Sequence, residues 1–313
     1  MSRNRVAMMG AAAAMCLAHA SGASGAAARA EPASSAFCSE RLTGAARVLT
    51  LDQRDEAGRV VPLTVFAPAA PGTYPLIAFS HGAFSSPARY RAMLEPLAAA
   101  GFVVIAPMHV DSEEFPRGPG EPTRPAHPIT WSTRNADMAL ALAPPPALRA
   151  ELERAGLSLD PERRAAWGHS YGALIAQVAG GAVAIEPDGT RKPRAQAGLD
   201  AVVGWSPPGA TPGLIDPAGW GFIDDLIRHL DAYANAPVTL RASWVGDGID
   251  HYFGGMFGRE KPASEHDSML FDRALATGLQ FTERALRVVA PCRLGPEIPG
   301  ETFEDSPGRT ERY

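Results

Sequence analysis

Short, continuously apolar runs that alternate with helical patterns are the feature that most limits how this 313-residue chain can fold. The runs YPLIAFSHG (74–82) and FVVIAPMH (102–109) lack polar alternation, which is typical of strands that helices cover on both faces. Between them, RYRAMLEPLAAAG (89–101) has a helical pattern that ends at a glycine. This alternation predicts a doubly wound, mostly parallel α/β sheet.

The alternation continues toward the C-terminus. Further strands are expected at 59–68, 163–169, 199–209 and 237–245, and further helices at 133–143, 173–181 and 271–286. In the first of these helices, Arg134 and Asp137 lie three residues apart, a spacing that predicts a structural pair. No repeat or linker divides residues 40–290. We therefore expect one domain, over residues 37–294, and a polar, disordered tail at 295–313.

Composition excludes several classes of partner. Apolar residues make up 46% of the chain and charged residues 20%, as in ordinary soluble globular proteins. A net charge of -5, without any basic block, gives no electrostatic footprint for nucleic acid. The chain has no H-E-x-x-H, no paired C-x-x-C, no P-loop and no G-x-G-x-x-G after a strand, so we expect no metal and no cofactor. Small molecules are the expected partners.

The N-terminus has the pattern of an export signal. Met1–Arg5 carries two arginines, and Val6–Ala20 is apolar but too short to span a bilayer. Small residues follow, with A-x-A-like cleavage options at Ala18-His19-Ala20 and at Ala28-Arg29-Ala30. The pattern predicts a signal peptide over residues 1–30, a periplasmic or secreted protein, and no stable membrane insertion. A disordered, Ala-rich cytoplasmic tail is the alternative.

Two cysteines, Cys38 and Cys292, lie near the two ends of the mature chain. In an oxidising compartment they would be able to pair, because the ends of a domain often lie close together. Closing so long a loop would stabilise the fold by roughly 4 kcal/mol in the chain-entropy model. Two unpaired, half-buried thiols are the alternative.

The sequence RRAAWGHSYGALIAQVAGG (163–181) contains the motif G-x-S-x-G, with Ser170 between two glycines. An apolar strand precedes the motif and a helix of small residues follows it. In this context the serine occupies a tight strand-to-helix turn, where bulky neighbours do not fit. The turn lifts the hydroxyl above the sheet, and the helix N-terminus favours developing negative charge. The pattern predicts that Ser170 is a nucleophile.

A serine nucleophile that attacks an ester also needs two backbone donors for the oxyanion. One is expected to be the N–H of the residue after the nucleophile, Tyr171. The other should come from an early loop after a central strand, and FSHGAFSS (79–86) fits because Gly82 lets the chain turn and leaves the N–H of Ala83 free to donate. The proline-rich loop 111–128 is expected to shape the substrate entrance.

The stretch LIAFSHGAFSSPARYRAMLEPLAAAGFVVIAPMHVDS, together with WGHSYGA, resembles the α/β-hydrolase branch of platelet-activating-factor acetylhydrolases and dienelactone-hydrolase-like bacterial esterases. The similarity covers about residues 60–285. It implies an α/β-hydrolase fold, a Ser-Asp-His triad and no cofactor. It also implies that Ala83 and Tyr171 form the oxyanion hole.

The general base has to be chosen among eight histidines. His81 and His169 are bound within motifs and are expected to point away from Ser170. His109 and His127 precede the serine, against the chain order of this fold. His251 is favoured, because it follows an expected strand and precedes an aromatic residue and two glycines, as the catalytic histidine of the resembled family does. His266, at the start of the closing helix, is the reserve.

The acid of the triad has no clear candidate. The resembled family has a strand ending in Gly-x-x-Asp before the histidine strand, and no such strand is visible between Pro208 and Pro237, so this strand is expected to be shortened or missing. Asp224, in the short apolar segment GWGFIDD that ends in Asp224 and Asp225, is the nearest equivalent. If residues 237–245 take the place of that strand, Asp247 or Asp250 becomes the acid and His266 the base. An incomplete triad is the third possibility.

These features predict a secreted serine esterase that cleaves carboxylic esters through an acyl-enzyme on Ser170. A thioesterase or peptidase is possible on the same triad. A binding protein without catalysis, in which the triad is incomplete, is the alternative from another class.

Overall fold

The computed structural model describes residues 8–11, 14–16, 36–186, 188–208, 241–257, 264–305 and 309–312. Most of the predicted signal peptide lies outside these ranges, as do Asp224, Asp225 and the whole of the segment expected to carry the acid. None of the described helices is both long and apolar enough to cross a membrane.

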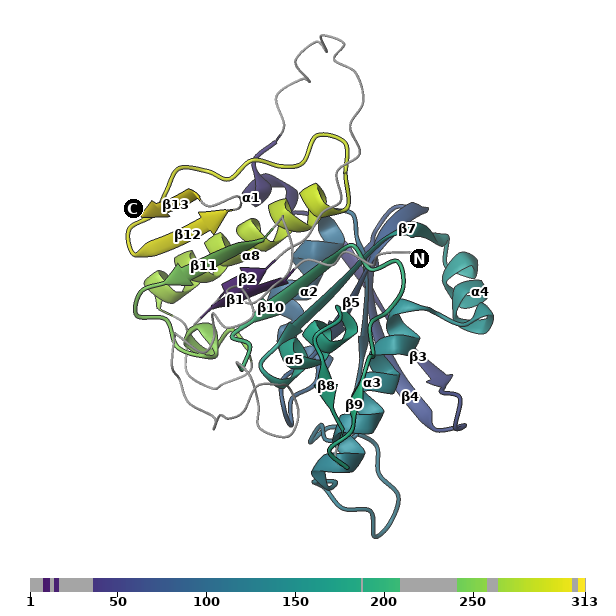
Figure 1. The fold of residues 1–313 in the computed structure, drawn as a ribbon. Coiled ribbons are helices and arrows are strands. Elements are labelled where there is room, and N and C mark those ends of the chain that lie inside the picture. The colour runs from purple at the N-terminus through teal and green to yellow at the C-terminus, as the bar shows by residue number, and fades with distance from the viewer. Residues whose placement is uncertain are drawn as a thin grey trace.

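Six strands form the central sheet, in the order β10-β7-β5-β6-β4-β3 (Figure 1). The first four run parallel to one another, β4 pairs antiparallel with β6, and β3 pairs antiparallel with β4. Every residue of β6 and β10 is buried, as their unbroken apolar runs predicted. The mostly parallel sheet is therefore confirmed. Its strands are β3 Ala46–Arg54, β4 Val60–Pro68, β5 Gly72–Ser80, β6 Val103–Pro107, β7 Leu157–His169 and β10 Ala201–Trp205.

Helices cover both faces of this sheet. The crossover from β5 to β6 moves one way along the sheet, whereas the crossovers from β6 to β7 and from β7 to β10 move the other way. Right-handed crossovers then place α2 on one face and α3 and α5 on the other. Figure 1 shows α3 and α5 side by side. The helices are α1 Cys38–Arg41, α2 Arg91–Ala99, α3 His127–Leu142, α4 Pro146–Arg154, α5 Tyr171–Ala179 and α8 Glu265–Ala285, with short 3₁₀ turns at Pro87–Tyr90 and Phe253–Gly255.

The register of the parallel strands aligns their carboxyl ends. Ser80 at the end of β5 pairs with Gly168 of β7, and Gly168 pairs with Gly204 of β10. The loops that follow these strands therefore leave the sheet at one edge, which is where doubly wound α/β proteins build their sites. The G-x-S-x-G motif and the loop after His81 meet there.

The C-terminal segment departs from its expected disorder. Strand β12 (Glu301–Asp305) pairs antiparallel with β11 (Ala242–Gly246) and with β13 (Arg309–Arg312). The buried carboxylate of Glu301 explains this order, because it accepts hydrogen bonds from Arg273, at 2.7 Å, and from the indole of Trp244, at 2.8 Å. Two small hairpins complete the described strands, β1 Met8–Ala11 with β2 Ala14–Cys16 and β8 Ala184–Ile185 with β9 Arg191–Lys192.

The two ends of the domain are joined covalently. Cys38 and Cys292 form a disulfide, with their Cα atoms 4.9 Å apart, and both residues are buried. The backbone N–H of Cys38 donates to the carbonyl of Arg293, at 2.8 Å. The pairing that the sequence left open is therefore present in the structure.

Candidate active site

Ser170 lies directly between β7 and α5 and has a strained backbone. Its φ of 54° and ψ of -122° belong to a region that residues with a side chain rarely adopt. Its N–H donates to the carbonyl of Trp205, at 2.9 Å, which fixes the turn to the end of β10. The turn predicted from the motif is present, with its serine at the N-terminus of α5.

The two glycines of the motif are required by close backbone contacts. A Cβ at Gly172 would collide with the carbonyl groups of Ser80 and His81, and a Cβ at Gly168 would collide with the backbone of Gly172. The turn is therefore pressed against the end of β5. This contact brings the loop after His81 next to the nucleophile turn.

The loop after His81, here called the oxyanion loop, carries Ala83, whose N–H is the second predicted donor of the oxyanion hole. A Cβ built on Gly82 would lie 3.5 Å from the Cβ of Ser170, so the two segments are in contact. Among the hydrogen bonds of the described residues, none uses the N–H of Ala83. Tyr171 is the first residue of α5, where backbone N–H groups point out of the helix end. Both predicted donors therefore lie beside Ser170.

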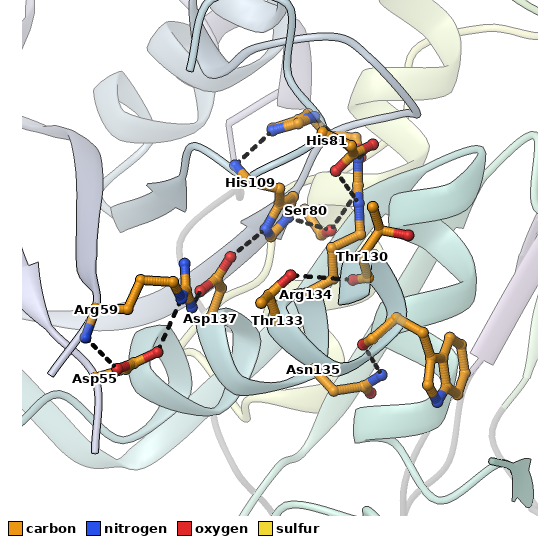
Figure 2. A network of polar contacts seen from close by, with 12 residues as sticks. Asp55, Arg59, Ser80, His81, His109, Thr130, Thr133, Arg134, Asn135 and Asp137 are labelled. Atoms are coloured by element: carbon orange, nitrogen blue, oxygen red, sulfur yellow. Dashed lines mark hydrogen bonds and ion pairs between the residues drawn. The ribbon is translucent and has the colours of Figure 1, made fainter. Parts of the chain in front are cut away.

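The buried side chain of Arg134 is hydrogen-bonded to this loop (Figure 2), a contact that was not predicted from the sequence. The guanidinium of Arg134, on α3, donates to the carbonyl of His81 at 2.6 Å and to the carbonyl of Gly82 at 3.1 Å. It also lies 4.6 Å from the ring centre of Tyr171. Arg134 therefore contacts both segments that carry the predicted oxyanion donors.

The charge of Arg134 is balanced by Asp111, in the loop after β6. Two parallel hydrogen bonds of 2.8 Å join the guanidinium to both carboxylate oxygens, and Asp111 also accepts from the N–H of Phe84, at 3.2 Å. Burial by itself raises the pKa of Asp111, but the charge and hydrogen bonds of Arg134 outweigh burial and hold this pKa well below its usual range. The predicted pair of Arg134 with Asp137 is not formed, because each side chain has a different partner.

The buried network continues from Arg134 through Ser80 to Asp137 (Figure 2), since Arg134 donates to the hydroxyl of Ser80 at 3.4 Å. The hydroxyl of Ser80 donates to Nε2 of His109 at 2.8 Å, and Nδ1 of His109 donates to Asp137 at 2.7 Å. Arg59 forms an ion pair with the same carboxylate. This order of groups is that of a catalytic triad, but all three side chains are completely buried and no substrate reaches them.

Burial sets the protonation of the network. It lowers the pKa of His109 and of His81 well below the ordinary value of 6.5, with a further lowering by neighbouring positive charge. Both rings are therefore neutral at neutral pH. Burial also raises the pKa of Asp137 to about 6, against the opposing charge of Arg59.

The structure brings His251, the predicted base, to the nucleophile turn. Its carbonyl lies 2.9 Å from Nε2 of His169, the residue before Ser170, and the two histidine rings are 4.8 Å apart. Ser206, at the end of β10, lies 3.4 Å from the same carbonyl through its hydroxyl. The backbone of His251 thus contacts the turn from the loop after β11, and its role as the base stays a prediction.

The reserve candidates lie elsewhere. His266 is exposed, and its Nε2 lies 3.1 Å from the carbonyl of Asp247, which is itself exposed. The carboxylate of Asp250 accepts the N–H groups of Tyr252 and Gly254, each at 2.9 Å, and shapes the loop that carries His251. Asp224 and Asp225 lie outside the described residues, so the acid stays a prediction.

Aromatic side chains on the elements that carry the site are either buried in the core or exposed. Trp131 and Trp205 are fully buried and belong to the core. Phe84 is 40% exposed and adopts a positive φ of 62° directly after Ala83. The guanidinium of Arg124, in the loop after β6, lies 4.4 Å from the centre of the Phe84 ring. Arg124, in the predicted entrance loop, therefore contacts the residue that follows Ala83, the predicted oxyanion donor.

Several solved esterase structures are similar to part of this chain. Brefeldin A esterase, described as a bacterial homologue of human hormone sensitive lipase, is 22% identical, with 42% of this chain and 34% of its own covered and a TM-score of 0.32. Esterase Est22 is 16% identical, with coverages of 43% and 37% and a TM-score of 0.34. A thermostable esterase from Pseudomonas putida ECU1011 is 19% identical, with coverages of 44% and 38% and a TM-score of 0.31.

This chain thus spans little more than a third of the length of these solved structures, and likenesses of this extent carry no argument about activity. The fold is established by the molecule itself. The mixed, mostly parallel sheet, the helices on both faces and the strained serine between strand and helix are those of the α/β-hydrolase fold.

Comparison with curated proteins finds no match. The narrower resemblance to platelet-activating-factor acetylhydrolases and dienelactone hydrolases therefore stays a prediction. The profile of the chlorophyllase family matches residues 40–210, a range that includes the whole central sheet, the oxyanion loop and the Ser170 turn. Because this match covers more than half of the chain, the chain belongs to the chlorophyllase family.

Proposed function

We propose that this protein is an exported serine esterase that cleaves carboxylic esters through an acyl-enzyme on Ser170. The observation that carries the proposal is the strained conformation of Ser170 at the N-terminus of α5, beside a backbone loop with an available donor. Strain of this kind persists where the surrounding structure holds it, and it gathers at catalytic sites. The chlorophyllase family match supports ester hydrolysis as the activity.

In the proposed reaction, Oγ of Ser170 attacks the ester carbonyl while His251 takes the hydroxyl proton. The N–H groups of Ala83 and Tyr171 stabilise the oxyanion that forms, each by about 3 kcal/mol in the transition state. His251 then protonates the leaving alcohol, and water releases the acid from Ser170. Asp224 is proposed to orient the imidazole.

Replacing the nucleophile tests this proposal. We expect Ser170→Ala to abolish both the turnover of p-nitrophenyl esters and covalent labelling by a fluorophosphonate. Ser158→Ala, on the same strand, is the matched control and should leave both unchanged. Peptide mass spectrometry of the labelled wild-type protein should place the label on Ser170 and leave Ser80 unmodified. Full activity of the Ser170→Ala variant, or the absence of any labelling of the wild type, would refute the esterase and favour a non-catalytic binding protein.

Small or medium esters are the proposed substrates, and Phe84 together with the loop after β6 is proposed to border their entrance. Phospholipids and polyesters are the wider candidates, and the family name adds chlorophyll to the panel. Thioesters and peptides test the two other reactions that the same triad permits. Comparing kcat/KM across p-nitrophenyl esters of increasing acyl length, and then across this panel, would identify the class.

Export to the periplasm or medium is part of the same proposal. The Cys38–Cys292 disulfide supports it, because structural disulfides persist in oxidising compartments. N-terminal sequencing of the protein recovered from the periplasm or medium should begin after Ala20 or Ala30. Recovery of the uncleaved chain in the cytoplasm alone would contradict export.

A further inference from the structure

Three segments of the proposed site meet on one buried pair of side chains, Tyr90 and His169. The N–H of Gly82, in the oxyanion loop, donates to the phenol oxygen of Tyr90 at 3.0 Å. That phenol lies 2.8 Å from Nδ1 of His169, and Nε2 of His169 lies 2.9 Å from the carbonyl of His251. The three hydrogen bonds thus connect the loop after β5, the turn after β7 and the loop after β11.

The chemistry of the groups fixes the direction of these hydrogen bonds. The carbonyl of His251 is able only to accept, so the ring proton of His169 lies on Nε2 and donates to it. The bare Nδ1 then accepts the phenol proton of Tyr90, whose oxygen accepts the N–H of Gly82. Burial raises the pKa of Tyr90 to about 12, so the phenol keeps its proton at every working pH.

Close packing holds the pair in place. The ring of Tyr90 lies 4.9 Å from that of Phe79 and 5.0 Å from that of Phe257, measured between ring centres. The His169 ring lies 4.7 Å from the ring of Phe257. A Cβ on Gly82 would come within 3.1 Å of Nδ1 of His169, so this ring sets how closely the oxyanion loop approaches the turn.

We propose that Tyr90 and His169 are positioning residues, which set the placement of the oxyanion donor and of His251 relative to the Ser170 hydroxyl. This proposal rests on the proposed function of Ser170. The three hydrogen bonds are in series, so removal of the phenol hydroxyl leaves the Gly82 N–H without its acceptor. It also removes the donor to Nδ1 of His169, so this ring no longer favours the form with its proton on Nε2. A displacement of about 1 Å at reacting groups is sufficient to lower a rate by about a hundredfold.

The test compares two tyrosines that each lose one hydroxyl. Tyr90→Phe keeps the aromatic packing and removes the connection, whereas Tyr74→Phe removes a hydroxyl that donates to the carbonyl of Ala70, far along the chain from the turn. We expect Tyr90→Phe to lower kcat for p-nitrophenyl esters by about tenfold or more with little change in KM, as loss of a transition-state interaction does. Tyr74→Phe should leave kcat unchanged.

Variants at His169 provide the second measurement. His169→Leu removes both hydrogen bonds, whereas His169→Gln retains an amide that is able to donate to the His251 carbonyl. We expect kcat to fall most in His169→Leu and to be partly restored in His169→Gln. The double variant Tyr90→Phe/His169→Leu should be no slower than His169→Leu alone, because the two residues act through one connection.

The outcomes separate this inference from the proposed function. If the wild type neither turns over esters nor reacts with a fluorophosphonate, the proposed function fails. If the wild type is active and folded Tyr90→Phe has the same kcat as Tyr74→Phe, the positioning role is overturned. Should Tyr90→Phe not fold, equal kcat values for His169→Leu and His169→Gln would overturn it instead.

Discussion

The hydroxyl groups of Ser80 and Ser170 have different surroundings, although Ser80 ends one parallel strand of the sheet and Ser170 directly follows its neighbour. Ser80 lies in regular strand and is closed in by His109 and Arg134. Ser170 lies in a strained turn, 5% exposed, at the N-terminus of α5. Residue type and a histidine partner are therefore not sufficient to identify a nucleophile. Backbone conformation and access to the site separate the two serines.

Arg134 is expected to affect both stability and turnover. Arg134→Gln leaves the Asp111 carboxylate buried without its charge partner, which costs about 3–5 kcal/mol of unfolding free energy. It also releases the carbonyl groups that fix the oxyanion loop, so kcat per folded molecule should fall. Arg273→Gln breaks the buried pair with Glu301 and is the matched control. Calorimetry of this control should show a similar fall in Tm, and ester turnover should show an unchanged kcat. An equal kcat in the two variants would contradict the assignment of Arg134.

Acid is expected to destabilise the fold through the buried histidines. Burial lowers the folded-state pKa of His81 and His109 below 6.5, so the unfolded chain binds protons first as the pH falls below that value. Their contribution to stability is complete above pH 6.5 and is lost below it, by up to about 1.4 kcal/mol per pH unit for each ring. The carboxyl of Asp137 has the opposite effect, because its folded-state pKa is raised to about 6. Between pH 6 and 3.8 the folded chain binds this proton first, so its contribution to the free energy of unfolding increases as the pH falls.

Urea unfolding between pH 7 and pH 5 measures this effect. His109→Gln should flatten the fall in unfolding free energy, since one of the two titrating rings is removed. His266→Gln, at an exposed position, should leave the slope as it is in the wild type. A slope in the His109→Gln variant as steep as that of the wild type would exclude this origin of the acid sensitivity.

At the scale of elements, the site is built from loops that follow strands. The loops after β5, β6, β7, β10 and β11 supply the oxyanion loop, Asp111, Ser170, Ser206 and His251. Among the site residues that the structure describes, Arg134 alone comes from the middle of a helix, and it reaches the site because α3 packs beside β5. The small sheet β11-β12-β13 matters to this arrangement, because β11 leads into the loop that carries His251.

Strand β12 is expected to stabilise the molecule. Deletion of residues 300–313 removes Glu301 and leaves Arg273 and the indole of Trp244 without their acceptor, so the unfolding free energy should fall by about 3–5 kcal/mol. Deletion of residues 306–313 keeps Glu301 and is the control, which should lower Tm much less. Thermal unfolding of both truncated proteins checks this. Equal Tm values would restore the expectation of a dispensable tail.

At the scale of the whole molecule, the chain closes on itself. The Cys38–Cys292 disulfide joins α1 to the segment that follows α8 and encloses nearly the whole domain. An ion pair of 2.7 Å between Arg41 of α1 and the buried Glu283 of α8 lies beside the disulfide. The two ends of the domain are thus held together by a covalent bond and an ion pair.

Loss of the disulfide is expected to lower stability without changing the chemistry. Cys38→Ser/Cys292→Ser frees a loop of 254 residues in the unfolded chain, which should cost about 4 kcal/mol in the chain-entropy model. The kcat of the folded variant should equal that of the wild type, because the cysteines belong to α1 and to the segment after α8, not to the loops that carry the site. Chemical unfolding with and without reductant measures the difference. If reductant lowers the stability of the double variant as much as that of the wild type, the effect has another source.

Local sequence patterns predicted the parallel sheet, the Ser170 turn and the two segments that carry the expected oxyanion donors. These follow from local patterns, because unbroken apolar runs need cover on both faces and only glycine fits beside the turn. The chain order also favoured His251 over His109. The strand β3 and the helix α4 were missed, since β3 is a half-exposed edge strand and α4 begins at the prolines that end the preceding helix pattern.

The partners of the buried charged residues depend on the tertiary structure and do not follow from their spacing in the sequence. Arg134 and Asp137 have the spacing of a helical pair, yet burial gives each one a partner from another loop or strand, Asp111 for Arg134 and Arg59 with His109 for Asp137. The disulfide and the order of Glu301 likewise depend on contacts between segments far apart in the chain. Local spacing fixes the conformation of a segment, whereas a buried charge or donor is satisfied by whichever group the packed fold brings to it.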